Sequence, residues 1–186
     1  MNAIDLCAYV GLVAVFLVTV NVSIGLLIAV RYSPVRYWPH HQFNIFRLHY
    51  WTGCIALGAS MLHPVVLLFS PTANFRLRDI VYPVHSPTQP LVNSIGAIAL
   101  YLILFVVVTS YFRVQLGRRL WKAFHFFVYA AGIALFWHSI FTDPNLKNSA
   151  IDFLDGEKVF VEICCLLIAG FAIARWRVAV RKARVR

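Results

Sequence analysis

The sequence predicts an all-α integral membrane protein, built as a bundle of five transmembrane helices. Of its 186 residues, 61% are hydrophobic and 13% are charged, and the mean hydropathy is +0.75. These values lie outside the usual range of soluble globular domains. Five segments are also apolar over roughly 18 or more residues, the length that a helix needs to cross about 30 Å of hydrocarbon.

Polar and proline-rich connections separate the five expected helices. We place the helices near Leu6–Val30, Leu48–Phe69, Val92–Phe112, Leu120–Phe141 and Val159–Trp176. The first is not expected to be a cleaved signal sequence, because no Lys or Arg precedes it and no small-residue cleavage site follows it. We find no internal repeat and no second domain, so residues 1–186 are expected to form a single transmembrane domain.

The long connection after the second helix is expected to lie along the outer surface. It contains four prolines between Ser70 and Pro90, which argues against a hidden sixth span. Within it, the run "FRLRDIVY" predicts a short interfacial turn.

Positive charge follows the positive-inside rule. Thirteen basic residues and no acidic residue lie in alternate connections and the C-terminal tail: Arg31, Arg36, Arg47, Arg113, Arg118, Arg119, Lys122, Arg175, Arg177, Arg181, Lys182, Arg184 and Arg186. This pattern predicts an outside N-terminus and a cytoplasmic C-terminus. The net charge of +10 therefore indicates topology and contact with anionic lipid, not nucleic-acid binding.

Four of the seven histidines fall inside predicted spans. His49 and His63 lie on the second helix, and His125 and His138 lie on the fourth. An ionisable side chain in hydrocarbon needs a partner and marks a candidate functional site. Because the two helices run in the same direction, His49 and His125 are expected at one depth near the cytoplasmic side. His63 and His138 are expected at a second depth near the outer side.

The spacing of His49 and His63 suits a large flat ligand. Fourteen residues bring an ideal helix back to within about 40° of the same face, over a rise of roughly 21 Å. The stripe between the two histidines carries only small residues, Gly53, Ala56 and Ser60.

The spacing of His125 and His138 is less regular. Thirteen residues turn an ideal helix by about 220°, which would place the two side chains on different faces. A π-bulge, a kink or a tilt of the fourth helix is expected to correct this.

Two histidines from facing helices at one depth can bind one haem iron axially. Two depths predict two b-type haems, with all four histidines as metal ligands and with irons on the order of 20 Å apart. Zinc is not favoured, because its sites need about four ligands in a compact cluster. The four cysteines, Cys7, Cys54, Cys164 and Cys165, show no metal-ligand spacing and are interpreted as small apolar residues.

Charged and aromatic residues near each pair are candidate partners of the haem carboxylates. Arg47, Arg118 and Arg119 lie near the cytoplasmic pair, although the positive-inside rule explains them equally well. Near the outer pair the candidates, either for the carboxylates or for an exit route of electrons, are Arg76, Arg78, Tyr82, His85 and Trp137. His40 and His41, beside Trp38, are interpreted as part of an interfacial belt.

The stretches "RLHYWTGCIALGASMLHP" and "LGRRLWKAFHFFVYAAGIALFWHS" resemble the ferric reductase-like transmembrane domain. This family includes the NADPH oxidases, the iron reductases and the haem-binding membrane subunit of the bacterial periplasmic methionine sulfoxide reductase system. The resemblance covers roughly residues 45 to 176. It implies two b-type haems held by His49, His63, His125 and His138, and electron transfer from the inside to the outside.

The chain departs from that family in two respects. Many members have six spans where five are expected here, so an N-terminal helix is expected to be absent. Reductases of the family continue into a flavin and nicotinamide domain, whereas this sequence shows no dinucleotide-binding glycine fingerprint. The resemblance therefore implies a cytoplasmic flavin protein or a membrane quinol as donor. The small size and the missing cytoplasmic domain predict a location in a bacterial inner membrane.

The predicted function is that of a transmembrane electron conduit, an oxidoreductase component that delivers electrons to an external reductase or a ferric acceptor. One alternative is a self-contained, quinol-dependent reductase of ferric chelates or oxygen. Another is a non-redox haem-binding sensor or membrane anchor. A five-helix protein whose histidines only pack would instead be colourless.

Overall fold

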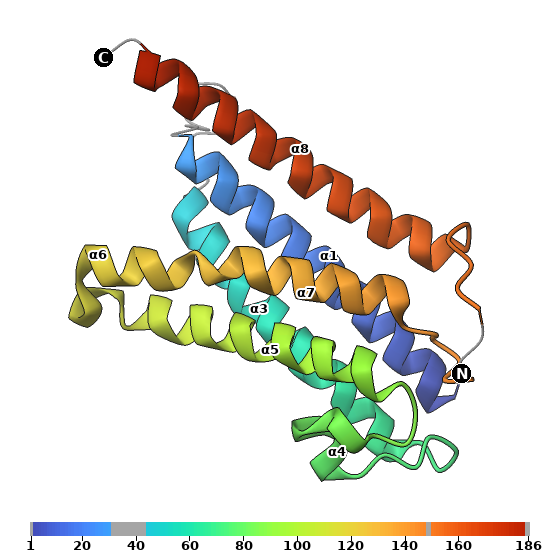
Figure 1. Cartoon of the computed structure of the whole chain (residues 1–186). Helices are drawn as coiled ribbons and strands as arrows, with labels where there is room; N and C mark the ends of the chain where they lie inside the picture. Colours follow the sequence, from blue (N-terminus) through green and yellow to red (C-terminus); the bar gives the residue numbers. More distant parts are fainter. Residues whose placement is uncertain (1, 31–43, 148–149, 185–186) are drawn as a thin grey trace.

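The computed structural model describes residues 2–30, 44–147 and 150–184, and over these ranges the chain is helical with no strand (Figure 1). Five helices are long and apolar enough to cross a membrane. They are α1 (Ala3–Ala29), α3 (Ile45–Val65) with its 3₁₀ extension η1 (Val66–Phe69), α5 (Pro90–Tyr111), α6 (Arg113–His125) running into α7 (Phe127–Phe141), and α8 (Gly156–Arg184). The prediction of an all-α protein with five membrane-spanning helices is confirmed.

Each of the five spans begins before its predicted start, and at α1 and α3 a polar cap precedes the apolar run. α1 opens with a capping box, in which the Asn2 side chain accepts from the Asp5 N–H at 2.8 Å. α3 opens at Asn44, whose side chain accepts from the N–H groups of Phe46 and Arg47 at 3.1 Å each. At the other terminus, α8 continues past Trp176 to Arg184.

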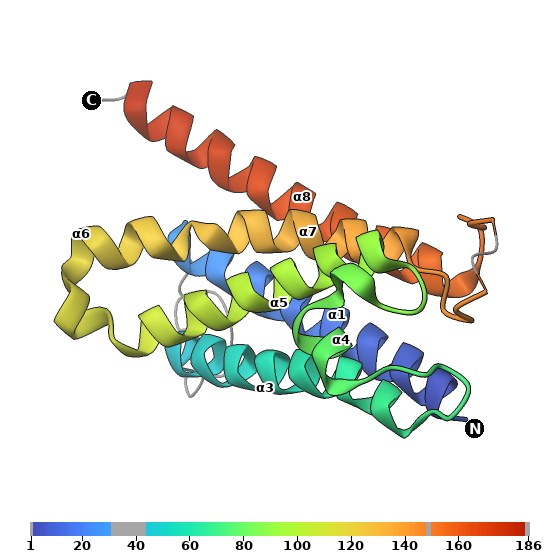
Figure 2. The same ribbon diagram turned by 60° about the horizontal axis from the view of Figure 1, so that its bottom comes forward.

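Two antiparallel hairpins form the centre of the bundle. α1 packs along α3 and α5 packs along α7, and contacts between α3 and α5 join the hairpins. α8 packs against α1 and α7, and a buried apolar cluster of Val15, Phe136, Val161 and Cys164 joins these three helices. Figure 2 shows the C-terminal half of α8 extending away from α7. Many apolar side chains elsewhere are exposed, as expected of helices that face lipid.

The long connection lies at the end of the bundle that holds the chain's N-terminus, as Figures 1 and 2 both show. It contains the short helix α4 (Leu77–Val81) and the 3₁₀ turn η2 (Pro83–His85). The expected interfacial turn is therefore present. With five residues, α4 is far too short to cross a membrane.

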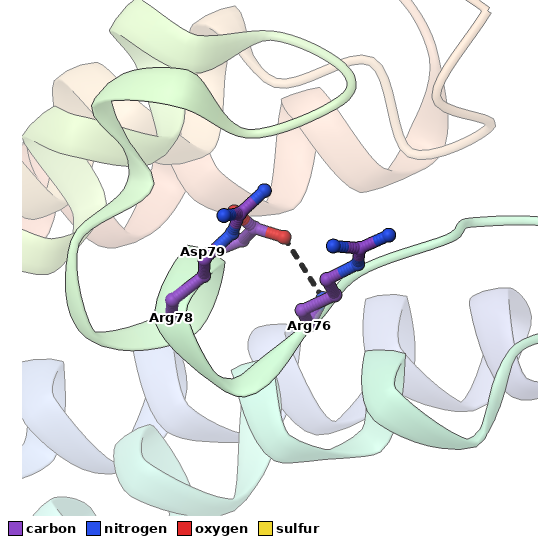
Figure 3. Close-up of polar contacts among 3 residues, drawn as sticks. All are labelled: Arg76, Arg78 and Asp79. Carbon is purple, nitrogen blue, oxygen red and sulfur yellow. Dashed lines mark hydrogen bonds and ion pairs between the residues drawn. The ribbon is translucent and has the colours of Figure 1, made fainter.

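Asp79 organises this connection (Figure 3). Its carboxylate is 5% exposed and accepts from the Arg76 backbone N–H at 2.9 Å. The Arg78 guanidinium lies 3.5 Å from the other carboxylate oxygen. The Tyr101 hydroxyl donates to the Val81 carbonyl, which ties α4 to α5.

The irregular spacing of His125 and His138 is met by an interruption of the helix at Phe126. The Phe126 N–H is shared between the Lys122 carbonyl at 3.2 Å and the Ala123 carbonyl at 3.3 Å, and the Tyr129 N–H lies 3.1 Å from the Phe126 carbonyl. The bonds to Ala123 and from Tyr129 span three residues, so they tighten the helix and supply part of the missing rotation. The alternative of a π-bulge is wrong at this position.

A second interruption lies at Gly117 inside α6, where φ is +72°. The tight turn between α5 and the apolar part of the fourth span is built around this glycine, because other residues rarely adopt such a conformation.

Some residues of the predicted pattern lie outside the described ranges. They are Arg31, Arg36, Trp38, His40, His41 and Arg186.

Candidate functional site

Helix packing brings the four intramembrane histidines together as two pairs. His49 and His125, here the basic-end pair, have ring centroids 6.2 Å apart and ring planes at 70°. His63 and His138, here the loop-end pair, have centroids 6.3 Å apart and planes at 72°. In each pair, one ring comes from α3 and the other from the fourth span, so each pair bridges the two hairpins.

In all four rings, Nδ1 has a hydrogen-bond partner on a neighbouring helix. The partners are the Asn21 carbonyl for His49 at 3.1 Å, the Cys7 carbonyl for His63 at 2.9 Å, the Val92 carbonyl for His138 at 2.9 Å, and the Ser110 hydroxyl for His125 at 3.2 Å. A carbonyl only accepts, so three of the rings must carry a proton on Nδ1. In the neutral ring, the free lone pair is then on Nε2, as in histidines that bind a metal through that atom.

The ring separations fit one shared metal ion per pair. With metal–nitrogen bonds of about 2.0–2.1 Å, two imidazoles on opposite sides of an ion have centroids roughly 6 Å apart. Edge-to-face aromatic pairs cover the same range, so the distance alone does not distinguish the two cases. The carbonyl partners of His49, His63 and His138 are compatible with metal binding, because they leave the Nε2 lone pair of these three rings available.

The side chains around the rings bear on whether a zinc ion or a haem fits each pair. Within residues 2–30, 44–147 and 150–184, no group of three or more His, Cys, Asp or Glu side chains could hold a metal ion. A compact zinc centre with about four protein ligands therefore has no support in this part of the chain. A haem needs only two axial protein ligands, because the porphyrin supplies the others, and the paired rings fit that requirement.

A cavity of about 170 Å³ lies beside the loop-end pair. Both rings line it, together with Gly11, Gly96 and Ser60. The Ser60 hydroxyl is buried and has no hydrogen-bond partner, a condition that costs about 1–3 kcal/mol. An unpaired hydroxyl beside a cavity fits a ligand site better than a solid protein core.

Lys158 is a cavity residue for which the sequence analysis proposed no role. It is 6% exposed, and its Nζ donates to the Ser139 carbonyl at 2.8 Å and the Thr142 carbonyl at 2.5 Å. It thus places a cation at the C-terminus of α7, the favourable end of the helix dipole. The sequence feature that could have identified it is a single lysine directly before the apolar segment that begins at Val159.

The predicted partners of the haem carboxylates do not line the cavity beside the loop-end pair. Arg47, Arg118 and Arg119 are exposed, on the helices that carry the basic-end pair, and their role stays a prediction. Of the candidates near the loop-end pair, Arg76 and Arg78 interact with Asp79, and Tyr82, His85 and Trp137 are exposed. Lys158 and Asp79 line the cavity instead.

Cys7 is more than the small apolar residue that the sequence suggested. Its thiol donates to the His63 carbonyl at 3.3 Å and lies 3.4 Å from His63 Nδ1. All four cysteines are free.

The fold and the site define a class, a helical membrane protein with two stacked histidine pairs between two hairpins. The chain belongs to the family described as ferric reductase like transmembrane component, whose model matches residues 10–136, more than half of the 186. The match begins within α1 and includes His49, His63 and His125, while His138 lies just beyond its end. No curated protein and no solved structure matches the chain.

Proposed function

We propose that the protein is a transmembrane di-haem b-type cytochrome that passes electrons across the membrane. The observation that carries this proposal is that the same arrangement occurs twice. Each pair joins the two hairpins with its rings 6.2 or 6.3 Å apart and every Nδ1 engaged. Membership of the ferric reductase-like family supports a membrane electron-transfer role.

A haem, when bound, supplies reversible one-electron exchange between ferric and ferrous iron. The chain's own residues hold the group and tune it. His49 and His125 would hold one haem, and His63 and His138 the other. Because two histidines would hold each haem, neither haem would have a vacant site for a substrate such as oxygen, which favours outer-sphere electron transfer.

Small residues line the route between the two histidine levels. The stripe between His49 and His63 is made of small residues, and the two levels are separated by a helix rise of roughly 21 Å. The positive-inside rule places the basic end of the bundle in the cytoplasm. Electrons then enter at the basic-end pair from a cytoplasmic flavin protein or a quinol, and leave at the loop-end pair to an extracytoplasmic acceptor. The membrane is a bacterial inner membrane in this proposal.

Vectorial transfer tests this function directly. The purified protein is reconstituted in liposomes that enclose ferricyanide, and a membrane-impermeant reductant is added outside. The wild type is expected to reduce the enclosed ferricyanide, whereas His49→Ala and His63→Ala are expected to lose this activity, because each interrupts the route at one level. A haem-loaded wild type that leaves the enclosed ferricyanide oxidised would overturn the proposal.

The same preparation separates the two alternatives. A self-contained reductase would turn over with quinol and a ferric chelate on one side, without a partner protein. A non-redox sensor would bind haem that exchanges readily and would not carry electrons between the compartments.

A further inference from the structure

Three of the four histidine rings rest on a glycine of the neighbouring helix. A Cβ added to Gly11, Gly25 or Gly96 would lie 2.9 Å from the His63 ring, 3.1 Å from the His49 ring and 2.7 Å from the His138 ring, respectively. Contacts this short cannot form without a shift of the ring. The glycines therefore create the space that the imidazoles occupy.

The same glycines also explain the Nδ1 hydrogen bonds. In each case the accepting carbonyl lies four residues before the glycine: Cys7 before Gly11, Asn21 before Gly25, and Val92 before Gly96. A helical carbonyl already accepts from the N–H four residues later, and the side chain of that later residue leans back over it. With glycine in that place, the carbonyl is uncovered and its second lone pair can accept from the histidine.

The register of these glycines repeats that of the histidines. Gly11 and Gly25 are fourteen residues apart on α1, as are the facing His63 and His49 on α3. On α5, the residue fourteen positions after Gly96 is Ser110. Its hydroxyl lies 3.2 Å from His125 Nδ1, so at this fourth position a side-chain oxygen replaces the backbone carbonyl.

Ser110 makes the basic-end pair chemically distinct. Besides its contact with His125, its oxygen accepts from the Trp121 indole N–H at 3.3 Å. In the proposed haem-bound state, Nε2 of His125 binds iron and Nδ1 carries the proton, so the Ser110 oxygen accepts from both His125 and Trp121. Each bond is then expected to be weaker than a bond to an acceptor with a single donor. A hydrogen bond from Nδ1–H makes a histidine a stronger electron donor to its metal, so His125 is expected to donate less than the other three.

We propose that α1 and α5, which carry none of the four histidines, are positioning helices for the haem ligands. Gly11, Gly25, Gly96 and Ser110 set the rotation of the four rings and keep the proton on Nδ1, which directs Nε2 to the iron. Ser110 gives the basic-end haem its own reduction potential. This inference rests on the proposed function, since it concerns how the haem ligands are held.

Glycine variants with matched controls test the positioning role. Gly11→Ala and Gly96→Ala are compared with Gly58→Ala on α3 and Gly132→Ala on α7, where an added Cβ meets nothing within 4 Å. The measurements are the haem-to-protein ratio and the low-spin ferric signals in electron paramagnetic resonance. In Gly11→Ala and Gly96→Ala, the loop-end haem is expected either to be lost or to become high-spin. The low-spin signal of the basic-end haem is expected to stay unchanged. The controls are expected to keep both.

Ser110 variants test the second part by potentiometric titration. Ser110→Ala removes the acceptor, so one of the two midpoint potentials is expected to rise while the other stays the same. Ser110→Thr keeps the hydroxyl and is expected to restore the wild-type value. A threonine variant that shifts as far as the alanine variant would contradict a role for the hydroxyl.

The outcomes separate this inference from the proposed function. A wild type without haem would remove both. A wild type with two low-spin haems, together with Gly11→Ala and Gly96→Ala variants that match the controls, would leave the function in place and overturn the positioning role.

Discussion

The two histidine pairs have nearly equal ring separations, yet neighbouring helices hold them differently. At the loop end, Nδ1–H of His63 and of His138 each donates to a backbone carbonyl at 2.9 Å. Each Nδ1 also has a further contact, with the Cys7 thiol at 3.4 Å or the Thr142 hydroxyl at 3.3 Å. At the basic end, the corresponding partners are a carbonyl at 3.1 Å and the Ser110 hydroxyl at 3.2 Å.

The helix behind each pair differs as well. His138 lies within α7, whereas His125 is the last residue of α6, directly before the interruption at Phe126. Backbone carbonyls keep their place under most side-chain substitutions, but a serine hydroxyl does not. The comparison therefore indicates that one side-chain substitution, at Ser110, can change the hydrogen bonding of the basic-end pair, whereas the backbone partners of the loop-end pair resist such a change.

The largest effects are expected from the histidines themselves. His63→Ala should lower the haem-to-protein ratio from two to one by removing the loop-end haem, and His49→Ala should do the same at the basic end. The two levels are separated by a rise of roughly 21 Å, so the remaining haem should keep its spectrum. Reduced-minus-oxidised spectra measure both. A folded variant that loses both haems would contradict independent pairs.

Replacing Lys158 with methionine should affect the loop end alone. The change removes the cation that caps α7 through the Ser139 and Thr142 carbonyls, with an expected loss of about 1–2 kcal/mol of stability. Without this positive charge, the loop-end haem should be harder to reduce, so its midpoint potential should fall. Thermal unfolding and redox titration are the measurements. An unchanged loop-end potential would show that Lys158 only caps the helix.

Gly117→Ala should act on the basic end. Gly117 has φ +72° and ψ 159°, a conformation open essentially to glycine alone, so a side chain there costs about 1–3 kcal/mol and the turn that precedes the His125 end of α6 should rearrange. The basic-end haem should dissociate at lower denaturant concentration, while the loop-end haem should follow the wild-type curve. Gly132→Ala is the control, since its added Cβ meets open space. Equal sensitivity of both haems would argue against a local effect.

The smallest effect is expected from Asn21→Leu. The Asn21 side chain donates to the His49 carbonyl at 2.6 Å and to Thr52 Oγ1 at 2.8 Å, so its loss removes two hydrogen bonds between α1 and α3. Such bonds in membranes contribute about 0.6 kcal/mol each. The Asn21 backbone carbonyl still serves His49 Nδ1, so both haems should remain. A variant that lost the basic-end haem would show that the side chain positions His49 more than the carbonyl does.

The number and approximate positions of the helices could be predicted from the sequence, because the length of an apolar segment and its capping residues are local features. The pairing of the histidines at two levels could be predicted as well, because the number of residues along two helices that run in the same direction determines the depth of each histidine. The thirteen-residue spacing of His125 and His138 predicted an irregular fourth helix, but not its kind or its position at Phe126, since the tightening of a helix depends on its backbone bonds and not on the identity of one residue.

The Nδ1 partners escaped prediction for a similar reason. A backbone carbonyl such as that of Cys7 or Val92 has no signature of its own in a sequence. The fourteen-residue spacing of Gly11 and Gly25 was a usable signal, because it equals the spacing of His49 and His63 on the facing helix. Lys158 was visible as well, but only the fold brings it to the cavity beside His138.

The most direct test of the central claim is a reduced-minus-oxidised absorption spectrum of the purified wild-type protein, with a haem-to-protein ratio measured on the same sample. The account predicts two low-spin b-type haems per chain, one in each histidine pair. A colourless protein, or one that takes up no haem when haem is supplied during expression, would contradict it. The four histidines would then be polar packing residues between two helix hairpins.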